Sequence, residues 1–246
     1  MILALLYHRI NGGQYSNSLQ IFRSHIGYLA GNFPVVLPGD PLPGGRIAVC
    51  LTFDDAYFDF YHYVYPLLCE LKIRALLSVS PKYIVGSTTV DAHTRLAVPH
   101  ERAMREEVYQ EEVPFCTWAE LSEMVGSGHV AVASHSYSHR ALTDRDADLT
   151  GEIAGSKGIL EERLRRAITT FVYPYGKVNK EAHRLALQHY RYTMRIGSAM
   201  NRDWDNAHRM VYRVNADMMP DPLYPLRKSN LAKYLLKYLS NTVRGR

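Results

Sequence analysis

Short apolar segments alternate with amphipathic ones along this 246-residue chain, and this alternation limits the folds that the chain can adopt. Continuous apolar runs are typical of strands that are buried on both faces of a parallel sheet. The sequence predicts such strands at residues 2–7, 47–53, 75–79, 129–133, 169–173 and 192–196. Helical periodicity predicts helices at residues 18–30, 61–71, 117–125, 152–166 and 180–189. Strands that alternate with helices form parallel βαβ units, so we expect an α/β fold.

One domain spanning residues 1–246 accounts for the length and the unbroken alternation, and we predict a (β/α) barrel, complete or incomplete. Residues 85–115 interrupt the pattern with a polar, charged stretch, which predicts an insertion or a flap. Residues 231–243 predict a basic amphipathic terminal helix. Its predicted apolar face consists of Leu231, Tyr234, Leu235, Tyr238 and Leu239. This helix either covers the barrel, which we favour, or contacts an anionic membrane surface.

Composition and charge narrow the classes of protein further. With 47% hydrophobic and 22% charged residues, the chain has the composition of a globular protein and not of a disordered one. The net charge of +5 favours anionic neighbours, but no basic segment has the pattern of a nucleic-acid-binding motif. Three cysteines without a CxxC spacing indicate reduced thiols. We therefore expect a cytoplasmic location, at most at the inner face of the membrane, without a signal peptide or transmembrane helix.

Two adjacent carboxylates, Asp54 and Asp55, follow the predicted strand that ends at Phe53. One interpretation is that the pair caps the following helix, because aspartate is a favoured N-cap residue. The other is that both serve one site, where one carboxylate binds a divalent metal and its neighbour accepts a proton from water. The pair by itself favours the capping role.

Two histidines, His135 and His139, follow a later predicted strand at a spacing of four residues. On a helical turn this spacing places both rings on one side. Two histidines and one carboxylate form a three-ligand metal site with an open position. A structural role is the competing interpretation, because the chain contains 11 histidines. Since the carboxyl ends of parallel strands meet at one end of a barrel, we expect the histidines to lie near the aspartates.

A third segment, Pro174-Tyr175-Gly176, follows another predicted strand, and the three segments together resemble the NodB-homology polysaccharide deacetylases. The T-F-D-D motif of that family matches residues 52–55 fully, and the H-S-x-x-H motif matches residues 135–139. The third motif of the family matches only at residues 174–176. The resemblance extends from about Ile2 to beyond Arg213 and is closest in motif style to the poly-N-acetylglucosamine deacetylase branch.

The resemblance implies a distorted (β/α) barrel and a metal-dependent enzyme that removes acetyl groups from N-acetylated sugars. It implies that Asp55, His135 and His139 bind the metal and that Asp54 is the general base. The backbone N–H of Tyr175 would stabilise the oxyanion. The implied metal is zinc, and the ligand chemistry also suits cobalt, nickel or iron.

Two features of the family pattern are missing from the sequence. Val172 stands near the position of an arginine that orients the catalytic aspartate in many members, and we expect Arg213 to replace this arginine. The L-x-H motif, whose histidine is the general acid, has no match after Arg213. The histidines left open as proton donors are His183, His189 and His208.

Substrate contacts are expected from residues next to the motifs. His8 follows the first predicted strand, where family members often carry a Tyr-His pair, although a structural histidine fits equally well. The expected substrate-contacting residues are His8, Tyr57, Pro174 and Tyr175.

The predicted function is hydrolysis of N-acetyl groups on an amino-sugar glycan of a cell surface or on its lipid-linked precursor. One alternative is an enzyme for another amide, such as an N-formyl sugar or a small cyclic amide. The other is a metal-bound, glycan-binding pseudoenzyme, suggested by the missing histidine and arginine. The presence of Asp54 argues against the pseudoenzyme, because a metal site alone does not need a second carboxylate.

Overall fold

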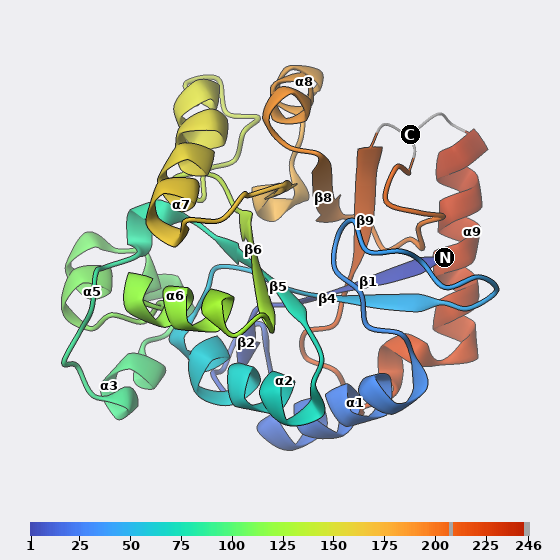
Figure 1. Ribbon diagram of the computed structural model, residues 1–246, viewed down its shortest axis with the longest axis horizontal. Helices are drawn as coiled ribbons and strands as arrows, with labels where there is room; N and C mark the ends of the chain where they lie inside the picture. Colours follow the sequence, from blue (N-terminus) through green and yellow to red (C-terminus); the bar gives the residue numbers. More distant parts are fainter. Residues whose placement is uncertain (207–208, 244–246) are drawn as a thin grey trace.

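Seven parallel strands form a closed barrel in the computed structural model, which describes residues 1–206 and 209–243 (Figure 1). The strands follow one another around the barrel in sequence order, and β9 closes it by pairing with β1. The barrel strands are β1 (Ile2–Tyr7), β4 (Ala48–Phe53), β5 (Ala75–Val79), β6 (Val130–Ser134), β7 (Thr170–Val172), β8 (Tyr192–Ile196) and β9 (Met210–Asn215). The expected α/β barrel is confirmed, and it is incomplete in the described residues, with seven strands where a full (β/α) barrel has eight.

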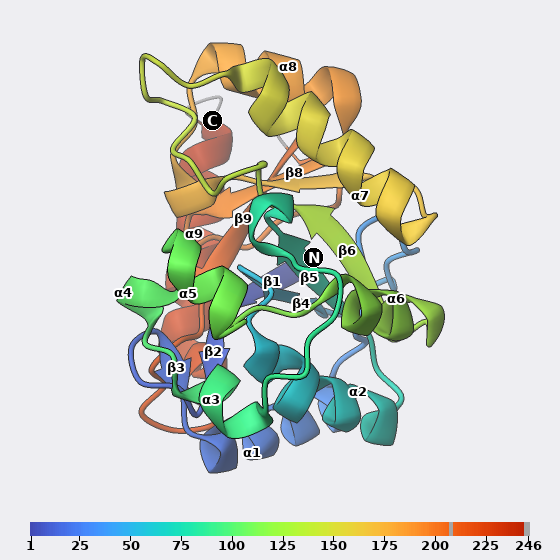
Figure 2. The ribbon, with the colours of Figure 1, turned by 90° about the vertical axis from the view of Figure 1, so that its left-hand side faces the viewer.

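Helices connect the strands and cover the outside of the barrel (Figures 1 and 2). They are α1 (Leu19–Asn32), α2 (Tyr65–Leu71), α3 (Ala92–Ala97), α4 (His100–Ala103), α5 (Glu106–Glu111), α6 (Trp118–Gly126), α7 (Ser156–Leu164), α8 (Lys180–His189) and α9 (Lys228–Val243). Short turns of other helix types are η1 (Phe60–Val64), η2 (Pro81–Tyr83), η3 (Gly151–Gly155), η4 (Pro174–Gly176) and η6 (Tyr224–Leu226). Two predicted helices begin with a π-helical turn, η1 before α2 and η3 before α7. The sequence did not predict these turns, because apolar periodicity does not distinguish the two helix types.

The alternation of side chains along the strands divides the core into two clusters. Residues such as Leu3 and Leu5 on β1 belong to the large cluster that packs beneath the helices. Their neighbours Ile2 and Ala4 belong to a smaller cluster, to which all seven barrel strands contribute and which therefore fills the barrel interior. Both faces of β1 are thus buried, which explains its continuous apolar sequence.

The barrel is weakest between β6 and β7. These strands share only one pair of aligned residues, Ser134 and Phe171, whereas β1 and β4 align along all six residues of each strand. A second, separate sheet of two short strands, β2 (Arg9–Ile10) and β3 (Ser16–Asn17), lies just beyond β1 and was not predicted. Strands of two residues are too short to give an apolar pattern.

The insertion at residues 85–115 carries α3, α4 and α5 and lies at one end of the molecule (Figures 1 and 2). Arg9, the first residue of β2, reaches into it. The guanidinium pairs with Asp59 at 3.2 Å and donates to the backbone carbonyls of Val98 at 2.9 Å and Leu96 at 3.4 Å. Arg9 and Asp59 are both 2% exposed, so this contact is made away from water.

A second buried arginine fastens the far side of the insertion. Arg95 of α3 forms a two-pronged ion pair with Glu120 of α6, with N···O distances of 2.6 and 2.9 Å. It also donates to the carbonyls of Val113 and Phe115, and its guanidinium lies 3.5 Å from the centre of the Phe58 ring. Breaking a buried charge pair of this kind is strongly destabilising. These contacts favour a fixed insertion over a flap.

The terminal helix α9 packs through a different face from the one predicted. Leu231, Tyr234 and Tyr238 are half-buried against the barrel, but Leu235 and Leu239 are 39% and 50% exposed. The predicted face was therefore wrong at both leucines. The contact ridge runs along one edge of the apolar stripe, so part of the stripe turns to solvent. None of the helices in the described part of the chain is long and apolar enough to cross a bilayer.

Candidate active site

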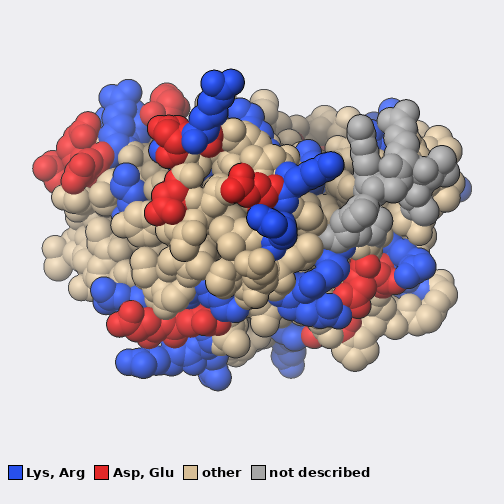
Figure 3. Space-filling model, turned by 90° about the horizontal axis from the view of Figure 1, so that it is seen from above, with Lys and Arg blue, Asp and Glu red and all other residues tan. Residues whose placement is uncertain are grey.

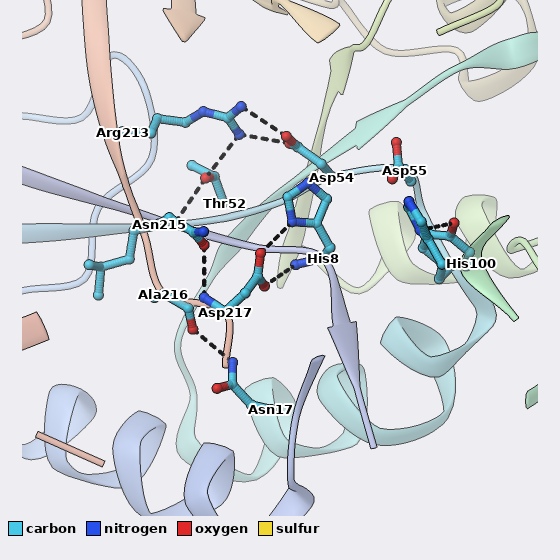
Figure 4. Close-up of polar contacts among 12 residues, drawn as sticks. His8, Asn17, Thr52, Asp54, Asp55, His100, Arg213, Asn215, Ala216 and Asp217 are labelled. Atoms are coloured by element: carbon cyan, nitrogen blue, oxygen red, sulfur yellow. Dashed lines mark hydrogen bonds and ion pairs between the residues drawn. The ribbon is translucent and has the colours of Figure 1, made fainter. Parts of the chain in front are cut away.

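The carboxyl ends of the strands bring several of the predicted residues together (Figure 4). Along β4 the interior-facing positions are Ala48, Cys50 and Thr52, and Asp54 continues this series just past the end of the strand. On β9, Arg213 faces the interior in the same way after Val211. Period-two alternation therefore directs an aspartate and an arginine into the same lumen.

Asp54 is held by Arg213 in a two-pronged ion pair. The Nη1–Oδ1 and Nη2–Oδ2 distances are 2.7 and 2.8 Å, and the hydroxyl of Ser78 donates to Oδ1 at 2.9 Å. Burial acts to raise the pKa of Asp54, but the charge and the hydrogen bonds of Arg213 outweigh it and hold this pKa well below its usual range. The carboxylate is therefore ionised and fixed in orientation.

Asp55, His135 and His139 form a compact group beside Asp54. The Nε2 atoms of His139 and His135 lie 3.3 and 3.7 Å from Oδ1 of Asp55. One ligand atom from each of the three residues lies within 4.8 Å of the others. His135 Nδ1 lies 2.9 Å from the carbonyl oxygen of Val172, which turns Nε2 toward the group.

The donors of this group fit a divalent metal. Among the described residues that are buried without a hydrogen-bond partner is Asp55 Oδ1, which faces both histidines, and such an atom is costly unless a ligand satisfies it. Burial lowers the pKa of His135 to about 4, so its ring is neutral and can bind a metal. Two nitrogens and one carboxylate oxygen suit zinc and related ions.

Strained backbone marks the same three segments. Five non-glycine residues of the motifs have left-handed φ angles: Asp55 (69°), Ala56 (55°), Ser136 (61°), His139 (55°) and Tyr175 (58°). Residues other than glycine adopt this region rarely, and a cluster of them requires that the surrounding structure enforce it. The backbone is thus bent to aim these groups rather than to make regular structure.

Pro174 and Tyr175 lie on the other side of His139. Pro174 is buried, whereas Tyr175 is 58% exposed and its ring packs edge-on against His139, with 4.7 Å between ring centres. The exposed tyrosine stands at the mouth of the barrel, where a substrate would pass. Of these two predicted contacts, only Tyr175 offers its side chain to solvent.

His8 is paired with Asp217, a residue that the sequence analysis missed. His8 Nδ1 lies 2.6 Å from Oδ2 of Asp217, and the backbone N–H of His8 donates to Oδ1 at 2.9 Å. Burial acts to lower the pKa of His8, but the hydrogen bond and charge of Asp217, with the charges of Asp54 and Asp55, raise it to about 9. In Figure 4 the ring lies between Asp217 and Asp54. A carboxylate two residues beyond β9 was the available sequence signal.

Tyr57 is placed differently from the expectation, and its partner His100 was not among the predicted residues. Tyr57 is fully buried, and its hydroxyl lies 2.7 Å from Nδ1 of His100, so its expected contact with substrate is replaced by a contact within the protein. His100 comes from the insertion, and the charge of Asp55 acts on its ring (Figure 4). The sequence gives no motif for it, because only the folded insertion brings it to the site.

The other histidines considered as donors are elsewhere. His183 and His189 lie on α8, and Nδ1 of His183 is 2.9 Å from the hydroxyl of Tyr173, which belongs to the cluster outside the barrel. The structure therefore does not bring either of them to the aspartates. His208 lies outside the described residues.

An Asp–Arg pair that faces the lumen lies beside an Asp-His-His group able to hold a divalent metal, at the carboxyl end of a parallel barrel. A family model described as polysaccharide deacetylase matches residues 43–194, which is more than half of the chain. The chain belongs to this family.

Similar proteins agree with this assignment. YxkH of Bacillus subtilis (strain 168), whose description places it among the polysaccharide deacetylases, is 25% identical over 196 residues, which are 74% of this chain and 59% of YxkH. The chain thus spans less than two thirds of that relative. The polysaccharide deacetylase BC0361 from Bacillus cereus is 18% identical with a TM-score of 0.73, covering 94% of this chain and 68% of BC0361. IcaB from Ammonifex degensii is 22% identical with a TM-score of 0.70, covering 94% and 97%. At these identities the two structures show a shared fold.

Metal binding is the first property to measure. We expect the purified protein, stripped with a chelator, to bind zinc in isothermal titration calorimetry, and Asp55→Ala and His139→Ala to lose about 100-fold or more in affinity, because even changes around metal ligands cost 10–100-fold. Asp54→Asn is the matched control, since it alters the neighbouring carboxylate and should keep most of the affinity. Equal zinc binding by wild type and Asp55→Ala would exclude the site.

Proposed function

We propose that this protein is a metal-dependent carbohydrate N-deacetylase that acts on an amino-sugar glycan of a cell surface, or on its lipid-linked precursor. The observation that carries the proposal is the fixed, ionised Asp54 beside the Asp55-His135-His139 group in a chain of the polysaccharide deacetylase family. Zinc is the proposed ion. A poly-N-acetylglucosamine-like glycan is the proposed substrate class, from the motif style of the chain.

The base side of the reaction is assigned to Asp54. Asp55, His135 and His139 would hold a divalent ion, which when bound would supply Lewis acidity toward water and the amide carbonyl. Asp54 accepts the proton of the attacking water, while Arg213 keeps both carboxylate oxygens in position. The water oxygen bonds to the acetyl carbon, and the backbone N–H of Tyr175 donates to the carbonyl oxygen as charge develops there.

The acid side is assigned to His8. When the carbon–nitrogen bond breaks, the sugar nitrogen needs a proton to leave as an amine, and acetate is the other product. His8 is protonated at neutral pH because its pKa is raised to about 9, and Asp217 fixes its ring. The sequence order differs from the family pattern, in which the donor follows the other motifs, since His8 precedes them all.

Of the competing functions, only the pseudoenzyme predicts a different set of residues. A glycan-binding pseudoenzyme does not need two proton-transfer groups, yet Asp54 has its Arg213 and His8 has its Asp217. An N-formyl sugar or a cyclic amide would use the same groups. Only the acyl group that fits beside the metal would separate these substrates from an N-acetyl sugar.

Acetate release tests the reaction directly. We expect the zinc-loaded protein to release acetate from N-acetylglucosamine oligomers, and Asp54→Asn to lower kcat by about 10²–10⁴-fold, the usual contribution of a general base. The variant should still bind zinc, which separates loss of chemistry from loss of the site. If the protein bound zinc but released no acetate, formate or ring-opened product from a panel of amides, the proposed hydrolase would be excluded. The glycan-binding pseudoenzyme would then be the supported function.

The pH dependence tests His8. An acid that must be protonated gives a kcat/KM that falls as pH rises through its pKa, so we expect a basic limb near pH 9 in wild type. Asp217→Asn removes a negative neighbour, which lowers the pKa of His8 and should move this limb to lower pH. Asp221→Asn, at an exposed ion pair with Arg227, is the control. An unmoved limb in Asp217→Asn would remove His8 from the mechanism.

We also propose that α9 makes peripheral contact with an anionic membrane surface. Its solvent side carries Leu236, 66% exposed, with Leu235 and Leu239, at 39% and 50%. The exposed lysines of the helix are Lys228, Lys233 and Lys237. Acidic and basic side chains are mixed on the face seen in Figure 3, whereas residues 228–243 include no acidic residue. Exposed leucines with basic neighbours suit a lipid headgroup region. The cytoplasmic location stays a prediction.

Vesicle co-sedimentation tests this contact. We expect binding to phosphatidylglycerol-containing vesicles, weakened by salt and by Leu236→Ser/Leu239→Ser, and little binding to pure phosphatidylcholine. Tyr28→Ser, which removes an exposed aromatic from α1, is the control for a general loss of apolar surface. Equal sedimentation with both lipids, or dimers that are lost in the leucine variant, would contradict the proposal.

A further inference from the structure

We propose that His100 is a substrate-binding residue that donates a hydrogen bond from Nε2–H to a hydroxyl or ring oxygen of the sugar whose acetamido group reacts. This inference rests on the proposed function, because it places a sugar at the mouth of the barrel. It assigns a recognition role to the insertion at residues 85–115, which lies outside the three motifs.

The position of His100 is enforced by a buried contact. The two carbonyl groups that Arg9 binds belong to Leu96 and Val98, just before Pro99 and His100. Arg9 is itself fixed by the buried Asp59. A guanidinium that holds the preceding turn sets where the next residue stands, so His100 is placed by Arg9 of β2 rather than by its own short helix.

The ring of His100 is also fixed in rotation. Its Nδ1 lies 2.7 Å from the hydroxyl of Tyr57, two residues beyond Asp55. A phenol keeps its proton at neutral pH and can donate it to Nδ1 of a neutral imidazole. Burial lowers the pKa of His100, which favours the neutral ring. The ring proton then stands on Nε2, ready to be donated.

His100 faces the site but is not a metal ligand. The group whose ligand atoms lie within 4.8 Å of one another contains Asp55, His135 and His139 without His100. Yet Asp55 is near enough for its charge to act on His100, and Figure 4 draws both residues in the same region of the site. The half-buried ring of His100 is thus partly open to solvent and stands apart from the metal-binding group.

An aromatic surface continues from His100 toward the proposed acid. The ring of Tyr15 packs edge-on against His100 at 5.0 Å and lies 5.7 Å from the ring of His8. Tyr15 is 40% exposed. Ring faces suit the C–H surface of a pyranose, and a polar donor beside them sets its orientation.

The competing explanation is that the His100–Tyr57 bond only fastens the insertion. The insertion is already held by Arg9 on one side and by the Arg95–Glu120 pair on the other. One further hydrogen bond adds little to two buried arginines. The two explanations differ in a measurable way, because a fastening role changes folding and every substrate alike.

Kinetics on two substrates separates them. For N-acetylglucosamine oligomers we expect His100→Ala to raise KM by roughly 2- to 12-fold, the effect of one lost hydrogen bond, with little change in kcat. Hydrolysis of 4-nitrophenyl acetate, which has no sugar, should be unchanged. His93→Ala, at an exposed histidine of α3, is the matched control. Equal losses on both substrates, a lowered Tm, or no loss on the oligomer would overturn the proposal.

Binding separates this inference from the proposed function. The zinc-loaded Asp54→Asn protein should bind the oligomer in calorimetry, and adding His100→Ala should weaken that binding by the same factor. Weakened binding in a protein that never releases acetate would support His100 while the proposed reaction failed. Equal binding with and without His100→Ala would overturn the role of His100 even in an active enzyme.

Discussion

The Arg213–Asp54 ion pair is the interaction on which both the barrel and its site depend. The residues lie 159 positions apart, on the last strand and just after the second, and meet in a lumen where Arg213 has no exposed surface. A buried charge without its partner costs several kcal/mol, about 3–5 in typical cases. Closure of the barrel and ionisation of Asp54 are therefore energetically coupled. The strands bring the two charges together, and the ion pair offsets the cost of burying each charge in the closed barrel.

The local part of this arrangement could be predicted from sequence. Apolar runs located six of the seven barrel strands, and alternation along β4 explains why Asp54 faces inward. The non-local part could not. His8 and Asp217 are 209 positions apart, and nothing near either residue indicates the other. Their pairing follows from the closure of β9 on β1, which is a property of the whole barrel.

The same limit applies at the edges of the fold. The apolar stripe of α9 was assigned to the core, but only the barrel surface decides which ridge of a helix finds a partner, and Leu235 was left outside. The charged insertion suggested mobility, because its exposed residues dominate the sequence. Arg9 and Arg95 bind carbonyl groups and carboxylates that the sequence pattern does not reveal. These contacts favour a fixed insertion.

The short pairing between β6 and β7 gives His135 a second, structural role. Backbone pairing there amounts to one aligned pair, at Ser134, and the imidazole of the next residue reaches across to the carbonyl of Val172. The His135 ring thus connects the two strands where their backbone hydrogen bonding ends. An ion bound to the other nitrogen of His135 would hold this ring in place. Metal occupancy of the site and the resistance of the barrel to local opening would then be thermodynamically linked. Metal binding at the site would therefore stabilise the fold most between β6 and β7.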